Sequence, residues 1–196
     1  MEVKSIKTED RIINATLLLL DEVGISDITT KKIADEAGVS EVTIFRKFKS
    51  KNNLLKIAKK SYTAYFLDKL DDIFKYRETN DLDFYFESIW LDLTSLLDDH
   101  LNIIKISMDE LREKSKDDKV LSLISNKIIE DLTYIFQKLI DEEKIRKINP
   151  KVAAITVFGV IFEGIILLKL YDEDSNKDIN QYAEDFLDIF INGIVL

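Results

Sequence analysis

The sequence has no cysteine, one proline and five glycines among its 196 residues. Without cysteine the chain forms neither disulfides nor thiolate metal sites, which is consistent with a reducing compartment. So little proline and glycine leaves few turn-forming residues for a many-stranded β protein. Lys, Glu, Asp, Leu and Ile recur instead at helical spacing, and the sequence therefore predicts an all-α fold.

The N-terminal stretch MEVKSIKTEDR is charged and lacks the apolar core of a signal peptide. We therefore expect a cytoplasmic protein. One apolar segment, residues 152–170, is about long enough to span a bilayer. Glu163 lies past its middle, where a carboxylate is costly in lipid, and a buried interface helix is favoured over a membrane span.

Charge is divided unevenly along this chain, whose net charge is -9. Residues 1–60 hold 12 Lys and Arg against 9 Asp and Glu, whereas the remainder holds 16 against 28. Between Ser40 and Lys60, seven basic residues accompany a single acid, Glu41. This asymmetry indicates two parts with different partners, one of which is a polyanion.

Capping signals predict two short helices in close succession near the N-terminus. Thr29 is placed as the N-cap of the first, with Ile28 and Ile33 as a hydrophobic staple, and Gly38 is placed to end it. Ser40 then caps the next helix only two residues later. Two short helices joined by a glycine-containing turn are typical of a helix-turn-helix.

Longer helices are expected on either side of this motif. They are predicted over residues 8–24, 51–76, 82–100, 101–112, 119–142, 150–171 and 178–194. Asn149 as N-cap and Pro150 at the first helical position open the apolar helix. We expect a helix-turn-helix domain over residues 1–50 and a second domain over residues 51–196, connected by helix 51–76.

The second helix of the motif offers a polar edge that fits a major groove about 12 Å wide. Glu41, Thr43, Arg46 and Lys47 form this edge, and Val42 is able to meet a thymine methyl. The stretch TTKKIADEAGVSEVTIFRKFKSKNNLL, residues 29–55, resembles the DNA-binding signature of the TetR/AcrR transcriptional regulators. The likeness covers about residues 8–60, and beyond them the chain resembles the family only in helical character, length and two final apolar helices.

The resemblance implies a three-helix head per subunit, a fourth helix leading to a larger effector-binding domain, and a dimeric bundle built from the last two helices. Phosphates would be bound by Thr29 or Thr30 and by Lys47, Lys49 and Lys51, and base edges by Glu41, Val42, Thr43 and Arg46. The full candidate set is Thr29, Thr30, Ser40, Glu41, Val42, Thr43, Phe45, Arg46, Lys47, Lys49 and Lys51. Phe45 replaces the family's usual Tyr and so lacks a hydroxyl for phosphate, and Val42 stands where smaller residues are common.

The acidic remainder contains candidates for an effector pocket and a dimer interface. For the pocket these are Tyr62, Tyr65, Phe66, Phe86, Trp90, Tyr134, Phe158, Phe162 and Glu163, and plain core packing is the favoured alternative for each. Glu163 could pair across a dimer, lie at the surface or meet a cationic ligand. The interface candidates are Gly159, Gly164, Tyr182, Phe186 and Phe190, with packing inside one subunit as the alternative for the glycines.

Catalytic patterns are missing from the sequence. His100, the only histidine, adjoins Asp98 and Asp99 at an expected helix end, and a solvated terminus is favoured there over a metal site. No Ser/His/Asp arrangement, phosphate-binding loop or metal-ligand cluster stands out. We therefore predict neither an enzyme nor a cofactor or metal requirement.

Motif, charge and resemblance together predict a homodimeric transcription regulator that binds a palindromic double-stranded DNA operator. A repressor is favoured over an activator. A small, largely apolar effector would shift the spacing of the two heads and release the DNA, without any membrane involvement. The alternative is a helical small-molecule- or protein-binding module whose head no longer reads DNA. Phe45, Val42 and the acidic composition motivate that alternative.

Overall fold

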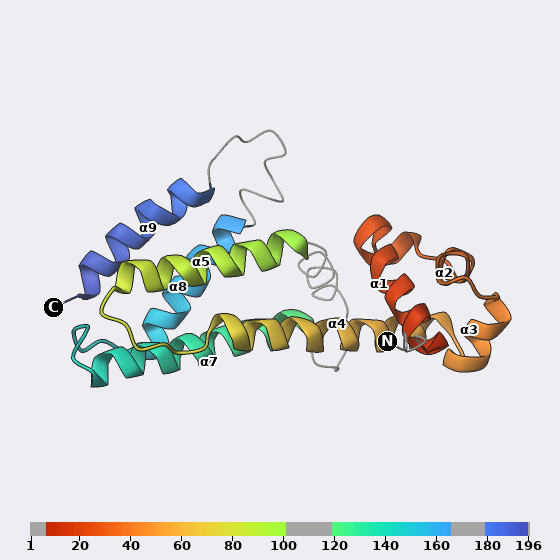
Figure 1. The fold of residues 1–196 in the computed structure, drawn as a ribbon, viewed down its shortest axis with the longest axis horizontal. Coiled ribbons are helices and arrows are strands. Elements are labelled where there is room, and N and C mark those ends of the chain that lie inside the picture. Colours follow the sequence, from red (N-terminus) through yellow and green to blue (C-terminus); the bar gives the residue numbers. More distant parts are fainter. Residues whose placement is uncertain (1–6, 101–118, 166–178, 196) are drawn as a thin grey trace, which may run out of the picture. The chain divides into compact units, whose positions relative to one another are not determined.

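The computed structural model describes residues 7–100, 119–165 and 179–195, and within these ranges the regular elements are α-helices (Figure 1). This confirms the predicted all-α fold. The helices are α1 (Thr8–Asp27), α2 (Thr30–Ala37), α3 (Glu41–Phe48), α4 (Lys51–Ile73), α5 (Leu82–Asp99), α7 (Val120–Asp141), α8 (Pro150–Ile165) and α9 (Ile179–Ile194). The helix predicted over 101–112 lies outside the described residues, as does the end of the one predicted over 150–171.

The chain separates into two compact units, and α4 runs from one into the other. The first, which we call the head unit, comprises residues 1–66 and 100–121. The second, the body unit, comprises residues 67–99 and 122–196. The division therefore falls inside α4, 16 residues beyond the boundary that the sequence suggested after residue 50.

The head unit packs α1, α2, α3 and the start of α4 around one apolar cluster. Its fully buried members include Ile12, Ile28, Ile33, Ile44 and Leu54. Ile28 and Ile33 flank the start of α2 as the expected staple, and both are completely buried. Local signals in the sequence thus set both the boundaries of α2 and its buried face.

Two sequence predictions for α1 are wrong, namely Thr8 as its N-cap and Gly24 as its end. Thr8 is the first helical residue, and Lys7 is the N-cap without a side-chain hydrogen bond. The helix continues past Gly24 to Asp27 and ends where Ile28 turns extended, with φ -74° and ψ 129°. Glycine permits a helix end but does not force one, and burial of Ile28 sets the end instead.

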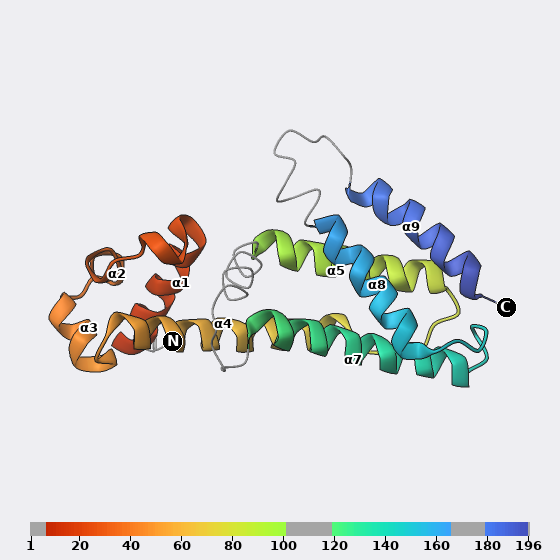
Figure 2. The same ribbon diagram turned by 180° about the vertical axis from the view of Figure 1, so that it is seen from behind.

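The body unit is organised by apolar stripes on long helices, and α5 packs along α9 (Figure 2). Helical spacing predicts an apolar stripe on α7, and five of its six residues are buried: Ile124, Ile128, Leu132, Ile135 and Leu139. The sixth, Leu121, is half-buried. The predicted N-cap of α8 is also confirmed. Asn149 Oδ1 accepts hydrogen bonds from the backbone amides of Lys151 (3.1 Å) and Val152 (3.2 Å).

Within the described residues, no helix combines the length and the apolar character needed to cross a membrane. The apolar segment 152–170 is described as far as Ile165, where α8 ends. In that part, Ala154 and Ile161 are buried whereas Val152 and Ile155 are exposed. This pattern is that of an amphipathic helix with one face on the body unit.

Candidate nucleic-acid interface

Two capping motifs fix α2 and α3 at a short turn. Thr29 is extended, and its Oγ1 accepts a hydrogen bond from the Lys32 amide at 3.2 Å. Gly38 adopts φ 62°, a left-handed conformation that glycine reaches without steric cost, and the Val39 amide returns to the Ala34 carbonyl at 2.9 Å. Ser40 Oγ then accepts from the Thr43 amide at 3.2 Å and starts α3. The predicted caps of both helices are confirmed.

A third contact at the turn was missed by sequence reasoning. Arg11 Nη2 of α1 donates to the carbonyl oxygens of Ala37 (2.6 Å) and Gly38 (3.3 Å). These carbonyls lie at the C-terminal end of α2, where backbone acceptors lack helical partners and a positive charge is favourable. Arg11 therefore connects α1 to the turn, although it precedes Ala37 by 26 residues in the sequence.

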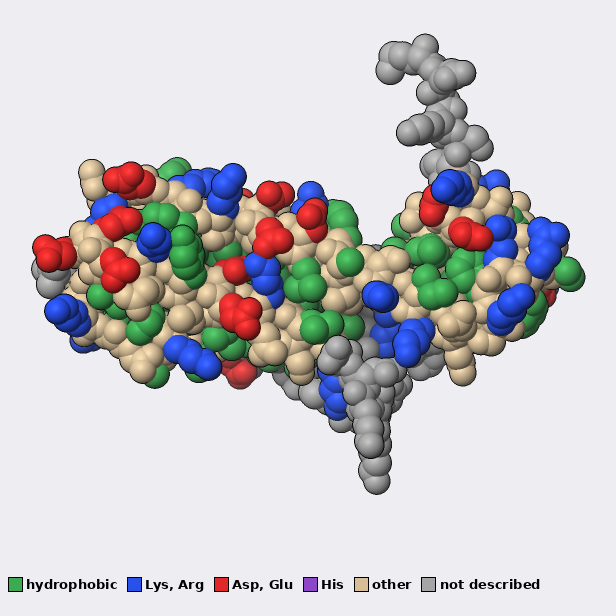
Figure 3. All heavy atoms as spheres, turned by 90° about the horizontal axis from the view of Figure 1, so that it is seen from below, with side chains coloured by type: hydrophobic (Ala, Val, Ile, Leu, Met, Phe, Trp, Pro, Cys, Tyr) green, Lys and Arg blue, Asp and Glu red, His purple; other side chains and the backbone are tan. Residues whose placement is uncertain are grey.

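The outer face of α3 combines exposed apolar and basic side chains. Ile44 and Phe48 are buried and anchor the helix to the head core. On the other side Val42 is 74% exposed and Phe45 is 46% exposed, and Arg46 is exposed as well. Figure 3 shows Lys and Arg side chains gathered beside apolar ones over the head unit. Of the predicted edge, Arg46 and Lys47 are exposed, whereas Thr43 and the first residue, Glu41, are half-buried.

That first residue, Glu41, is half-buried and accepts a hydrogen bond from the hydroxyl of Thr30 on α2. The carboxylate therefore lies against α2 instead of pointing away from the head as a base-reading group would. The same bond uses the hydroxyl proton of Thr30. Thr29 differs, since its oxygen accepts from a backbone amide and its O–H stays available as a donor.

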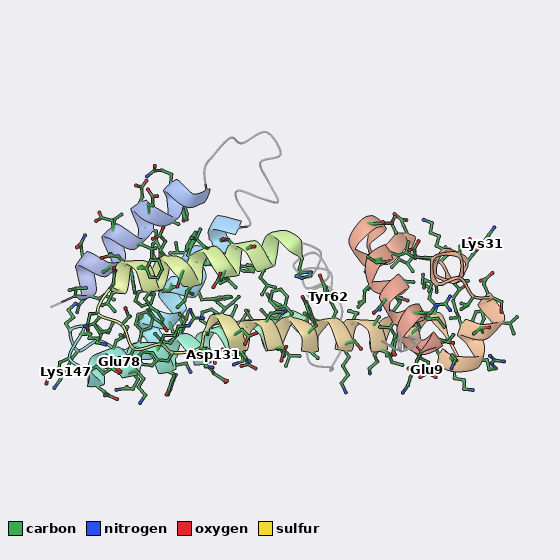
Figure 4. The ribbon with its side chains drawn as sticks, viewed as in Figure 1. Glu9, Lys31, Tyr62, Glu78, Asp131 and Lys147 are labelled. Carbon is green, nitrogen blue, oxygen red and sulfur yellow. The ribbon has the colours of Figure 1, made fainter. Side chains whose placement is uncertain are left out.

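Lys47 also has a partner that sequence reasoning missed. Its Nζ lies 2.9 Å from Oε1 of Glu9 in the first turn of α1, and Figure 4 labels Glu9 there. The hydrogen bond and the positive charge of Lys47 lower the pKa of the Glu9 carboxyl. No local pattern links positions 38 residues apart, so only the three-helix packing reveals this pair. Of the remaining lysine candidates, Lys49 is exposed and Lys51 is half-buried.

Three pocket candidates meet His100 within the head unit. Tyr62 and Phe66 are buried, whereas Tyr65 is exposed. The Tyr62 hydroxyl lies 2.9 Å from His100 Nδ1, and the rings of all three residues stand edge-on to the imidazole with centroids 5.5–6.3 Å away. The solvated terminus predicted for His100 is therefore wrong, because aromatic side chains half-bury it.

The other pocket candidates lie in the body unit in different surroundings. Phe86 stacks on Phe136 with centroids 5.5 Å apart, and both are buried. Phe158 and Phe162 are half-buried and stack on each other at 5.6 Å. Tyr134 is exposed beside Lys138, and Glu163 is exposed as well. These candidates thus do not form one cluster.

Trp90 and the interface candidates are brought together inside one chain. The Trp90 ring centroid lies 6.0 Å from that of Tyr182 and 6.1 Å from that of Phe186. Phe190 follows on α9, stacked on Phe186 at 5.6 Å. A Cβ atom on Gly164 would lie 3.0 Å from the Tyr182 ring, so this glycine permits close approach of α9 within the chain. Gly159 is exposed and has open space beside it.

Comparison with known proteins identifies the head. A family model described as "Bacterial regulatory proteins, tetR family" matches residues 12–58, the segment that contains the caps, the turn and α3. Residues 12–58 therefore belong to the TetR family of bacterial regulatory proteins. This match places the head among bacterial regulatory proteins and not among enzymes.

Two kinds of similar protein extend this likeness. An uncharacterized HTH-type transcriptional regulator of Bacillus subtilis, YvkB, is 50% identical over 48 residues, which span 24% of this chain and 25% of that protein. A TetR transcription regulator from Haloarcula marismortui shares the fold with a TM-score of 0.72 at 16% identity, over 96% of this chain and 98% of the other. The regulator FadR of Bacillus subtilis, solved with stearoyl-CoA, gives 0.67 at 22% identity over 94% and 98%.

Proposed function

We propose that this TetR-family chain is a DNA-binding transcriptional regulator that uses α3 as its recognition helix. The observation that carries the proposal is the outer face of α3, where Arg46 and exposed apolar side chains stand on a helix anchored by Ile44 and Phe48. A recognition helix held in this way by two caps and a buried face fits the major groove.

Phosphate contacts in this proposal come from residues around α3. Thr29 has a hydroxyl that can donate at the N-terminus of α2, and Lys49 is exposed just after α3. Lys47 would exchange its Glu9 carboxylate for a phosphate. Such contacts supply most of the nonspecific affinity and make it fall steeply with salt.

The proposal includes a homodimer on a palindromic operator and a role as a repressor. One small head contacts few base pairs, and a symmetric pair doubles the recognised sequence. The exposed apolar side chains of Val152 and Ile155 on α8 and of Ile189 on α9, which is 75% exposed, support association through these helices. Gly159, with open space beside it, would permit close approach of a second chain.

An apolar effector that acts on the body unit completes the proposed mechanism. The unit has an aromatic interior, and within the described residues the buried indole N–H of Trp90 has no acceptor. A ligand with an apolar body and one acceptor suits that environment. Because FadR of Bacillus subtilis binds stearoyl-CoA, long-chain acyl compounds are the first class to examine.

Selection of bound fragments from genomic DNA tests the proposed function. The purified full chain should enrich fragments that share a palindrome, and binding to them should weaken steeply between about 50 and 200 mM salt. A variant with Arg46→Ala and Lys47→Ala is the matched control, since neither residue belongs to the buried core of the head. Failure of the wild-type chain to enrich any sequence, with weak binding that ignores salt, would support a module that does not read DNA.

For the effector, stearoyl-CoA is the probe and coenzyme A without the acyl chain is its control. Release of the selected DNA by the first and not the second supports an apolar effector. Equal release by both, or release by neither, would contradict this assignment of the ligand class.

A further inference from the structure

The base-reading surface of α3 can be defined more narrowly than by its sequence alone. Successive helical residues turn by about 100°, so residues four apart lie on one face. Val42 and Arg46 form such a pair opposite the buried Ile44 and Phe48, and Phe45 flanks them. The centre of the outer face is therefore one apolar side chain beside one guanidinium.

Glu41 stands apart from this centre. Its position brings it to the side of α3 that faces α2, where its carboxylate accepts the hydrogen bond from Thr30. A carboxylate that reads bases accepts from the N4 amine of cytosine, which requires it to point into the groove. With its carboxylate engaged inside the head, Glu41 fixes the angle between α2 and α3 instead.

The chemistry of the remaining pair selects particular bases. In the major groove only thymine offers a C5-methyl group, and an apolar side chain gains by covering it. Guanine offers O6 and N7, the acceptors that match a guanidinium. The Cβ atoms of residues four apart on a helix are about 5–6 Å from each other, and stacked bases are about 3.4 Å apart, so the two contacts fall within one or two base pairs.

We propose that α3 reads a thymine methyl through Val42 within one or two base pairs of a guanine bound by Arg46, while Glu41 is a positioning residue that touches no base. This inference rests on the proposed function. DNA is the occupant that the surface favours, because Arg46 and Lys49 border the exposed Val42 and Phe45 with positive charge. A second protein chain would need a complementary acidic surface.

Deoxyuridine substitution in the selected operator tests the methyl contact. Uracil pairs as thymine does but lacks the C5-methyl, so each thymine is replaced in turn and the affinity is measured with the wild-type chain and with Val42→Ala. At one position per half-site, the replacement should weaken wild-type binding roughly fourfold, the value for one buried methyl group. The same replacement should leave the affinity of Val42→Ala unchanged, whereas Arg46→Ala should keep the sensitivity to the methyl.

Two results would overturn the methyl contact. In the first, the wild-type chain binds equally well whichever thymine is replaced by deoxyuridine. In the second, the replacement weakens binding of Val42→Ala as much as it weakens binding of the wild type. These failures are distinct from failure of the proposed function. A chain that selects a palindrome but ignores the methyl groups is still a regulator, whereas one that selects no sequence loses both proposals.

Variants at Glu41 test its positioning role. Glu41→Gln keeps an acceptor for the Thr30 hydroxyl and should retain both the affinity and the order of preference among the four base pairs at each operator position. Glu41→Ala removes the acceptor and should weaken binding to all sequences severalfold without changing that order. A changed base preference in either variant, above all at a cytosine, would show that Glu41 reads bases.

Discussion

The head unit and the body unit are each stabilised internally by a different kind of interaction. In the head, side-chain caps at Thr29 and Ser40 and the left-handed Gly38 set the helix ends within a few residues of sequence. In the body, rings from α5, α7 and α9 meet, as in the contacts of Phe86 with Phe136 and Phe190. A short recognition motif thus depends on local geometry, whereas the larger unit depends on packing between distant segments.

The two units also differ in charge. The head needs a positive outer face and a small core, and residues 1–60 carry a slight excess of Lys and Arg. The body is acidic on balance and mixes that charge with exposed apolar positions. Negative charge on the body would repel DNA and leave binding to the head. Substitutions in the two units should accordingly change the free energy of unfolding and the affinity for DNA by different amounts and in different directions.

The largest effect is expected in the body unit. Trp90→Ala removes a side chain that is only 1% exposed and should lower the free energy of unfolding by about 3–5 kcal/mol. Phe84→Ala on the same helix, where the side chain is 67% exposed, should change it by less than about 0.5 kcal/mol. Denaturant titration followed by circular dichroism measures both. Similar losses in the two variants would mean that the ring cluster does not dominate this unit.

A smaller effect of defined sign is expected for glycine substitutions. Gly38→Ala places a Cβ on a residue with φ 62° and should destabilise the head by about 1–2 kcal/mol. Its new Cβ would also lie 2.9 Å from Arg11 Nη2. Gly193→Ala, in a helix of the body with open space around it, should instead stabilise by about 0.5–1 kcal/mol. Thermal unfolding of the two variants distinguishes these signs, and stabilisation by Gly38→Ala would contradict the turn geometry.

The ion pair between Glu9 and Lys47 should affect DNA binding more than folding. Glu9→Gln frees Lys47 for a phosphate and removes a nearby negative charge, so operator affinity should rise severalfold at low salt. Asp10→Asn removes the same charge one residue away and should raise affinity less. Fluorescence anisotropy with labelled operator provides the measurement. Weaker binding by Glu9→Gln would mean that Glu9 orients Lys47 toward DNA instead of competing with it.

The smallest expected effect is a pH dependence in the body unit. Glu142 pairs with Lys144 at 2.8 Å and accepts from the Tyr76 hydroxyl at 2.6 Å, and these partners lower the pKa of its carboxyl. A carboxyl whose pKa is lowered by folding adds stability above its unfolded pKa and loses it as the pH falls through the folded value. The wild type should therefore be slightly more stable than Glu142→Gln at neutral pH, and the difference should vanish as the pH falls below the ordinary glutamate pKa of about 4.3 and through the lower folded pKa.

Glu130→Gln is the control for this pH dependence, since Glu130 is an exposed residue of α7. It should show no such convergence with the wild type when unfolding is followed across the same pH range. A constant difference between Glu142→Gln and the wild type at every pH would contradict the pairing.

Local patterns allowed much of the head to be predicted from sequence. Thr29, Gly38 and Ser40 act within four residues of their partners, so spacing alone located both helices of the motif. Gly24 shows the limit of such signals, because burial of Ile28 decided where α1 ends. The side-chain partners of Glu41 and Lys47 were not predictable, since each is set by how one helix lies on another.

The body unit was predictable as helices but not as contacts. Periodicity located α7 and its buried stripe, because a helix repeats the same face every three to four residues. It carried no information on which helix covers that face. Trp90 was therefore a pocket candidate and Tyr182 an interface candidate, whereas their rings lie side by side in one chain. The prediction of a solvated helix terminus at His100 was wrong for the same reason.

The central claim, that α3 reads sequence, is tested most directly by equilibrium binding of the wild type, Arg46→Ala and Lys47→Ala to the selected operator and to a permuted duplex across a salt series. The wild type should prefer the operator by about a thousandfold or more. Arg46→Ala should lose at least about tenfold of that preference, whereas Lys47→Ala should weaken both duplexes alike and flatten the salt dependence. Equal affinity of the wild type for both duplexes, or an identical uniform loss in both variants, would contradict the account.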